Sequence, residues 1–101
     1  MIYEENLLPK VSFIIPTLNA AWILPKCLFA IRNQAYPQKK IEIVIADGGS
    51  TDNTIRIAKR YNSIVIDNPS VNQEPGKSLA AKKATGEILF FTDADNVIVG
   101  R

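Results

Sequence analysis

The sequence predicts an α/β fold with three layers, in which helices cover both faces of a parallel sheet of four strands. Short runs of β-branched and aromatic residues alternate with segments whose apolar residues recur at helical spacing, in the order βαβαβαβ. Polar turns follow the strands, and right-handed crossovers would bring these turns to one edge of the sheet. Ligands of open α/β sheets bind beyond the carboxyl ends of the strands, so this edge is the predicted site.

The chain is predicted to open with an arm and a strand. Residues 1–10 show no clear period, and we interpret them as an arm that leads into a domain over residues 11–101. The first strand is predicted over residues 11–15, because this run is rich in β-branched residues, and it should end at Pro16. A short polar turn over residues 16–19 follows it.

The first helix is predicted over residues 21–34. Its regular part should begin near Leu24, because Pro25 suits the first turn of a helix. Cys27 falls on the apolar face, which favours a buried structural cysteine over a nucleophile. Trp22 is assigned to the core rather than to the site.

The remaining elements follow the same alternation. Asp52 is the favoured N-cap of the second helix, and Gly86 is the expected C′ glycine of the third. The other strands are predicted over residues 41–46, 63–66 and 88–91, and the other helices run from Asp52 to about Tyr61 and from residue 76 or 77 to residue 85.

The last strand carries the predicted site. Residues 88–91 are apolar throughout, which is typical of a strand buried on both faces. Asp93 and Asp95 follow it two positions apart, so both can face one point, and Asn96 adds a neutral oxygen. Two carboxylates this close repel each other unless a cation or a proton lies between them, and oxygen ligands favour Mg²⁺ or Mn²⁺ over zinc. We interpret this as a metal–diphosphate site; the alternative is a polar loop that caps a helix.

The composition excludes several classes of function. The formal net charge of +2 is too small to predict a nucleic-acid partner, and no apolar run reaches the length of a membrane span. Histidine is absent, which removes the commonest general base and the usual zinc ligand. A single cysteine and an amino terminus without the basic start of a secretory signal predict a cytoplasmic location. For a longer protein, the sequence also allows a location at the inner face of the membrane.

Three blocks of sequence, in this order, resemble an inverting family 2 glycosyltransferase of the GT-A fold. They are residues 11–19 (VSFIIPTLN), 42–52 (EIVIADGGSTD) and 84–95 (ATGEILFFTDAD). The resemblance covers nearly the whole chain beyond the arm. It implies a Rossmann-like half-domain that binds a nucleotide-sugar, linked to UDP or GDP.

The resemblance also implies roles for the first two blocks. Pro16, Thr17 and Asn19 would line the pocket for the base and ribose. Asp47 would contact the nucleobase or ribose, whereas Gly48 replaces the second acid of the common Asp-Asp pair, so that only Asp47 would read the base.

The same resemblance implies that three further residues would bind the diphosphate end of the donor. Asp95 would bind the metal together with Asp93, which would also contact the ribose or the donor sugar. Lys77 falls where the family carries an arginine near the diphosphate. Leu18 departs from the family, in which many members have a tyrosine that stacks on the base.

We expect the chain to be only the donor-binding part of such an enzyme. The family needs a second half with an acceptor groove and a carboxylate that acts as general base, and no acid after Asp95 fits that role. The chain alone should therefore bind a nucleotide-sugar weakly and transfer little, with no catalytic residue of its own. Without further strands, residues 88–91 would form a bare apolar edge, which predicts self-association.

We compare three alternative functions with the sequence. A nucleotidyltransferase should have a glycine-rich and basic loop after the first strand, and residues 16–19 do not provide one. A phospho-receiver domain needs acids at the same place, where Leu18 and Asn19 stand. A regulatory nucleotide-binding module remains open, and the sequence names neither the sugar, the base nor the acceptor.

Overall fold

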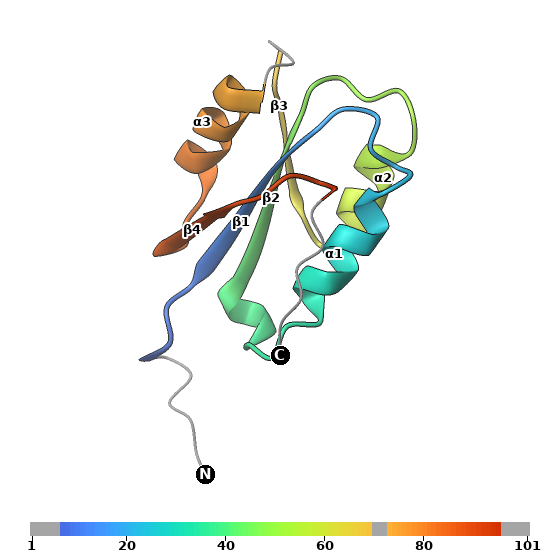
Figure 1. Cartoon of the computed structure of the whole chain (residues 1–101). Helices are drawn as coiled ribbons and strands as arrows, with labels where there is room; N and C mark the ends of the chain where they lie inside the picture. The colour runs from blue at the N-terminus through green and yellow to red at the C-terminus, as the bar shows by residue number, and fades with distance from the viewer. Residues whose placement is uncertain (1–6, 70–72, 96–101) are drawn as a thin grey trace.

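A computed structural model describes residues 7–69 and 73–95 of the chain. The elements follow the predicted order, with one additional 3-10 helix before the second strand (Figure 1). The strands are β1 (Val11–Thr17), β2 (Ile41–Asp47), β3 (Ile64–Asp67) and β4 (Ile88–Phe91). The helices are α1 (Leu24–Arg32), η2 (Gln38–Lys40), α2 (Thr54–Arg60) and α3 (Gln73–Lys83).

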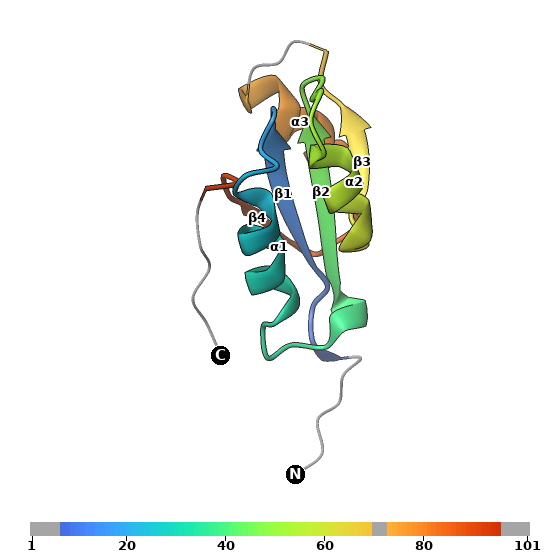
Figure 2. The ribbon, with the colours of Figure 1, turned by 90° about the vertical axis from the view of Figure 1, so that its right-hand side faces the viewer.

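The four strands form one parallel sheet in the order β3-β2-β1-β4. Helices α1 and α2 lie on one face of the sheet and α3 lies on the other (Figure 2). This is the predicted three-layer, Rossmann-like α/β fold, and it places the carboxyl ends of β1 and β2 at one edge. Within residues 7–69 and 73–95, no helix is long and apolar enough to cross a membrane.

Pro16 lies inside β1 rather than at its end, so the predicted end of this strand was wrong. Ile14 O accepts a hydrogen bond from Thr92 N (3.1 Å), whereas Thr17 O accepts one from Gly48 N on the β2 side (2.9 Å). Since backbone groups alternate between the two neighbours of a strand, Pro16 faces the β4 side. β4 pairs with residues 11–14 only. The proline, which has no N–H, therefore lies beyond the part of β1 that is hydrogen-bonded to β4.

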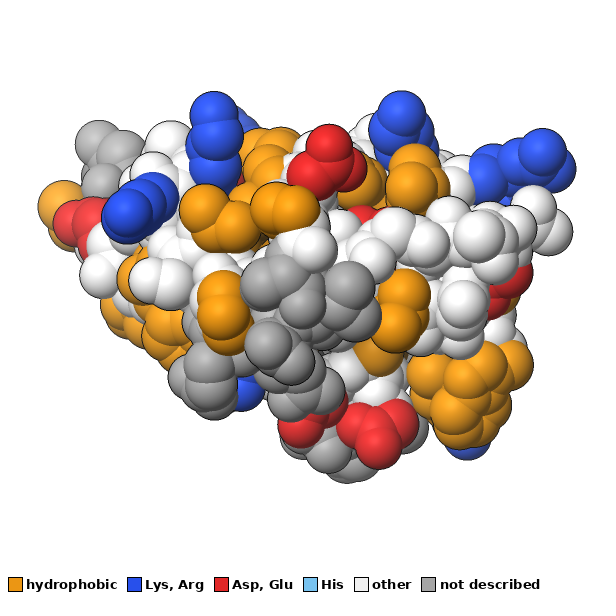
Figure 3. All heavy atoms as spheres, turned by 90° about the horizontal axis from the view of Figure 1, so that it is seen from above, with side chains coloured by type: hydrophobic (Ala, Val, Ile, Leu, Met, Phe, Trp, Pro, Cys, Tyr) orange, Lys and Arg blue, Asp and Glu red, His pale blue; other side chains and the backbone are white. Residues whose placement is uncertain are grey.

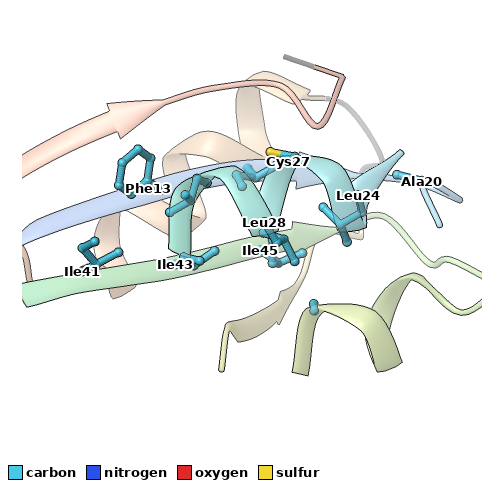
Figure 4. Close-up of a cluster of buried hydrophobic side chains, with 11 residues drawn as sticks. Phe13, Ala20, Leu24, Cys27, Leu28, Ile41, Ile43 and Ile45 are labelled. Carbon is cyan, nitrogen blue, oxygen red and sulfur yellow. The ribbon is translucent and has the colours of Figure 1, made fainter. Parts of the chain in front are cut away.

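The larger hydrophobic core lies between the sheet and the helices α1 and α2 (Figure 4). Its side chains with no exposed surface come from both layers: Ile15, Ile43, Ile45, Leu24, Cys27, Leu28, Ile31 and Ala58. Burial raises the pKa of the Cys27 thiol to about 11, and the negative charge of Asp95 adds to this effect. The thiol is therefore protonated at neutral pH, as expected of a structural cysteine.

Gly86 has a different role from the predicted one. α3 ends at Lys83, and a Cβ on Gly86 would lie 2.5 Å from Ser12 Oγ and 2.7 Å from Ser12 N. The glycine is needed because the backbone passes directly against β1, not because it closes a helix. α3 also begins earlier than predicted, at Gln73, since a proline in the first turn, here Pro75, does not interrupt a helix.

Glu42 joins the strands at the amino end of the sheet. Its carboxylate accepts hydrogen bonds from Ser12 Oγ (2.7 Å) and from Thr85 N and Oγ1 (both 2.9 Å). Ser12 Oγ in turn accepts one from Gly86 N (2.9 Å). Burial opposes the charge of Glu42, but these hydrogen bonds outweigh it and lower the pKa. The segment that leads into β4 is thus held in place at its start.

β4 is not buried on both faces, which corrects the prediction for residues 88–91. The side chains of Ile88, Leu89, Phe90 and Phe91 are 46%, 39%, 54% and 47% exposed. β4 is the outer strand of the described sheet, and α3 packs mainly over β1 and β2, which leaves the faces of β4 less covered. Phe90 recovers some contact by stacking on Phe13, with ring centroids 5.3 Å apart. The apolar edge that the sequence predicts is therefore present.

Candidate functional site

A cavity of about 390 Å³ opens where the carboxyl ends of β1 and β4 meet the start of α1. Figure 3 looks onto this edge of the molecule, where acidic and hydrophobic side chains share the surface. The cavity has one wall from the segment after β1 and another from the segments after β3 and β4. It is lined by Pro16, Thr17, Leu18, Ala20, Trp22, Ile23, Asn68, Asp93, Ala94 and Asp95.

Asp47 lies behind this cavity and supports it. Its side chain is 2% exposed, and Oδ1 accepts hydrogen bonds from Thr17 Oγ1 (2.7 Å) and Ser50 Oγ (2.6 Å). Oδ2 accepts from Gly49 N (3.0 Å) and Ser50 N (2.7 Å). Burial opposes ionisation, but these bonds outweigh it and lower the pKa of Asp47. With both oxygens engaged, Asp47 holds Thr17 and the following loop in position.

Asn19 and Gly48 lie in the loops beside the cavity rather than in its wall. Asn19 adopts a left-handed backbone conformation (φ 49°), and its Oδ1 accepts a hydrogen bond from Thr51 N (2.8 Å). Its own N–H donates to Ser50 Oγ (2.8 Å), and Gly48 N donates to Thr17 O (2.9 Å). These bonds join the loop after β1 to the loop after β2.

Asp52 contributes to the same junction, although it is not the N-cap that the sequence predicts. The N-cap of α2 is Asn53, and Asp52 Oδ1 accepts a hydrogen bond from Thr54 N (2.9 Å). Asp52 Oδ2 accepts one from Ala21 N (3.1 Å), across the boundary between the two loops. The hydrogen bond from Thr54 Oγ1 is the main reason why the pKa of Asp52 is lowered.

Asp93 and Asp95 both line the cavity, although residues 94 and 95 form a turn and not the extended chain that the sequence analysis assumed. Ala94 between them packs against the core on the α1 side, which turns the chain at this point. Asp93 Oδ1 is buried and makes no hydrogen bond to any residue that the structure describes. A buried carboxylate oxygen without a partner is costly, so it favours a cation or a donor from a ligand at this position.

Two carboxylates that line one cavity are oxygen donors of the kind that a divalent cation binds. Mg²⁺ commonly binds one or two protein carboxylates and completes its shell with water and substrate phosphates. Among residues 7–69 and 73–95, no group of three or more acidic, histidine or cysteine side chains could hold a metal by itself. Asn96, named with these acids from the sequence, lies outside the described residues.

Lys77 lies elsewhere. It is on α3 and lines a separate hollow with Ser78, Ala81 and Phe91, on the other face of β4. The structure therefore brings Pro16, Thr17, Asp93 and Asp95 together in one cavity, but Lys77 does not share it.

Asn68 and Trp22 are among the residues of the cavity wall that were not predicted. Asn68 is 2% exposed, and its N–H donates to Asp47 O (2.7 Å), so it links β3 to the site. Its amide packs so close to Gly76 that a Cβ there would lie 2.5 Å from Asn68 Nδ2. Trp22 is 78% exposed and lines the cavity, so its assignment to the core was wrong. Only the position of Asn68 in a loop at the carboxyl edge could have indicated its role.

Comparisons with known proteins identify the family to which the chain belongs. The sequence profile of glycosyl transferase family 2 matches residues 12–99. The glycosyltransferase AglE of Haloferax volcanii is 35% identical over 94 residues, which are 87% of this chain and 31% of that protein. The poly(ribitol-phosphate) beta-N-acetylglucosaminyltransferase TarS of Staphylococcus aureus is 34% identical over 97 residues, and the chain spans 17% of its length.

Solved structures show the same fold. The crystal structure of S. aureus TarS 1-349 has a TM-score of 0.83 at 32% identity, with 88% of this chain and 28% of that chain covered. A structure of the same protein in complex with UDP gives 0.82. The mannosyltransferase PcManGT from Pyrobaculum calidifontis, in complex with GDP-Man and Mn²⁺, gives 0.80 at 32% identity, again over 88% of this chain and 28% of that chain.

Proposed function

The chain belongs to glycosyl transferase family 2, and we propose that it forms the donor-binding part of a metal-dependent inverting glycosyltransferase. The ligand is a nucleoside-diphosphate sugar, held in the cavity at the carboxyl edge of the sheet. One observation carries this proposal: the unpartnered, buried Oδ1 of Asp93 lies in a cavity that Asp95 also lines. That arrangement suits a ligand that arrives with a divalent cation.

Different residues of the cavity would bind different parts of the donor. Asp93 and Asp95 would hold Mg²⁺ or Mn²⁺, which when bound stabilises the charge on a departing nucleoside diphosphate. Thr17, fixed by Asp47, presents the end of β1 to the base and ribose together with Pro16. Asp47 acts on the ligand through these neighbours, because its own oxygens are occupied.

Relatives support this choice of ligand. The structures with UDP and with GDP-Man and Mn²⁺ superpose on 88% of this chain. Both have a nucleoside diphosphate in common, while base and sugar differ. We therefore assign the nucleoside diphosphate to this chain and leave the base and the sugar open.

The complete transfer reaction is proposed for a longer protein. The chain spans 31% of AglE and 17% of TarS, so the acceptor groove and the general base belong to sequence outside the match. As a 101-residue chain it should bind the donor and transfer little. A cytoplasmic location remains a prediction of the sequence.

Two copies of the chain are proposed to associate through β4. The support is an open strand edge with four large apolar side chains, at a net charge of only +2 that gives little repulsion. A second copy would pair its own β4 with this edge and cover the exposed rings.

Calorimetric titration of UDP and of GDP, with and without Mn²⁺, tests the donor site. We expect binding that depends on Mn²⁺ and that Asp95→Asn weakens by more than about 10-fold, because this substitution removes a charged ligand of the cation. Asp67→Asn is the matched control, since Asp67 is an exposed acid at the end of β3 that does not line the cavity. Equal binding with and without the metal, or no binding of either nucleotide, would reject the proposal.

A further inference from the structure

The cavity combines apolar side chains with its carboxylates. Leu18, Trp22 and Ile23 contribute an apolar wall from the segment between β1 and α1, and Leu18 and Trp22 are 48% and 78% exposed. Asp93 and Asp95 line the same cavity from the segment after β4. A ligand that fills it should therefore have one flat apolar part and one part that brings a cation to the carboxylates, as a metal-bound diphosphate does.

The backbone that carries Trp22 is fixed on both sides. Ala20 N donates to Thr54 Oγ1 (2.8 Å) and Ala21 N donates to Asp52 Oδ2 (3.1 Å), which ties this segment to α2. On the other side, Ile23 N and Leu24 N donate to Ala20 O at 3.0 and 2.8 Å. The backbone that carries the indole is thus already ordered, so a ligand that covers the indole does not have to order the main chain.

We propose that Trp22 is the platform on which the nucleobase of the donor stacks. The inference rests on the proposed function, because a nucleoside diphosphate has the two parts that the cavity requires. Every base has a π-face, so a tryptophan platform binds the base without selecting its identity. The diphosphate then extends toward Asp93 and Asp95.

Intrinsic fluorescence tests this contact directly, because Trp22 is the only tryptophan of the chain. UDP and UMP, each titrated with Mg²⁺, should quench the emission, whereas glucose 1-phosphate should not, since it lacks the base. Quenching by glucose 1-phosphate without quenching by UMP would overturn the proposal, because the indole would then cover a sugar.

Substitutions separate this contact from the site as a whole. Trp22→Ala should weaken UDP binding in calorimetry by roughly 10-fold, within the range that base–aromatic stacking contributes, and Trp22→Phe should restore most of the affinity. Phe29→Ala is the control, because Phe29 is a 59% exposed aromatic residue of α1 outside the cavity. Circular dichroism of each variant shows that the fold is intact.

The outcomes distinguish the two proposals. If wild-type protein binds UDP and Trp22→Ala binds it equally well, the stacking role is wrong while the donor site stands. If wild-type protein binds neither UDP nor GDP with a divalent cation, the donor site itself is wrong and the stacking role fails with it.

Discussion

The Thr17 hydroxyl donates a hydrogen bond of 2.7 Å to Asp47 Oδ1, and this bond joins the carboxyl ends of β1 and β2. Thr17 faces the cavity, whereas Asp47 is buried behind it. The loop after β2 is held by the same carboxylate through Gly49 and Ser50. The geometry of the cavity at the carboxyl edge of the sheet therefore depends on the buried charge of Asp47.

Replacing this charge should destabilise the protein. Asp47→Ala leaves the buried hydroxyl of Thr17 and the N–H groups of the loop without an acceptor, so we expect a loss of about 2–3 kcal/mol in the free energy of unfolding. Urea unfolding measures it. Asp67→Asn, an exposed acid, should change stability by less than about 0.5 kcal/mol. A loss no larger for Asp47→Ala than for this control would contradict the role of Asp47.

Stability should also fall at acid pH. Hydrogen bonds outweigh burial and hold the folded pKa values of Asp47 and Glu42 below their ordinary values of 3.8 and 4.5. A carboxyl group of lowered pKa contributes stability that is complete above its unfolded pKa and disappears as the pH falls through its folded pKa. The decline should therefore begin near pH 4 to 5 and continue below it.

The variants identify the groups responsible for this decline. Urea midpoints measured from about pH 6 to about pH 3 should fall less steeply in Asp47→Asn and in Glu42→Gln than in the wild-type protein. Slopes that are identical in all three proteins would assign the acid sensitivity to other groups.

The close approach at Gly86 predicts strong sensitivity to size. Gly86→Ala would place a methyl group 2.7 Å from the backbone nitrogen of Ser12, which cannot move without disturbing β1. We expect a loss of about 1–3 kcal/mol in thermal or urea unfolding. Lys83→Ala, an exposed substitution at the end of α3, is the control. If Gly86→Ala matches that control, the contact with β1 is looser than the structure indicates.

We predict that Asp93 contributes to ligand binding and not to the stability of the ligand-free protein. Asp93→Asn replaces a buried carboxylate whose Oδ1 has no partner by a neutral amide, so the ligand-free variant should be at least as stable as the wild-type protein. Mg²⁺ with UDP should raise the Tm of the wild-type protein, because a ligand that binds only the folded state stabilises it, but not that of the variant. An equal rise in both proteins would show that Asp93 does not hold the cation.

Self-association through β4 should be sensitive to charge. Leu89→Lys combined with Phe91→Lys places two cations on one face of the edge strand, and sedimentation velocity should then show a monomer where the wild-type protein dimerises. Phe29→Lys alters an exposed ring on α1, away from this edge, and should leave the dimer intact. A monomeric wild-type protein at high concentration would reject the proposed dimer.

Local patterns in the sequence were sufficient to predict most of the fold. The bounds of β4 are correct, and α1 starts at Leu24 as Pro25 indicates, because these features depend on neighbouring residues. The parallel sheet follows from alternation of strands and helices. Asp93 and Asp95 could be predicted to lie at the carboxyl edge because they directly follow a strand.

Features that depend on distant parts of the chain were missed. Trp22 was assigned to the core, but the turn after β1 directs it outward, and no local pattern shows this. Gly86 owes its identity to Ser12, which lies 74 positions earlier in the chain. Asn68 enters the cavity wall because β3 ends beside Asp47. The roles of Gly86 and Asn68 depend on the order of strands in the sheet rather than on the residues beside them.

The exposed apolar wall of Leu18 and Trp22 has a consequence for how such a domain can change. These side chains contribute little to the folded core, whereas the buried bonds of Asp47 fix the backbone beneath them. Substitutions on the wall can therefore accumulate at almost no cost in folding. A scaffold built this way can diversify the molecules it accepts while its architecture stays the same.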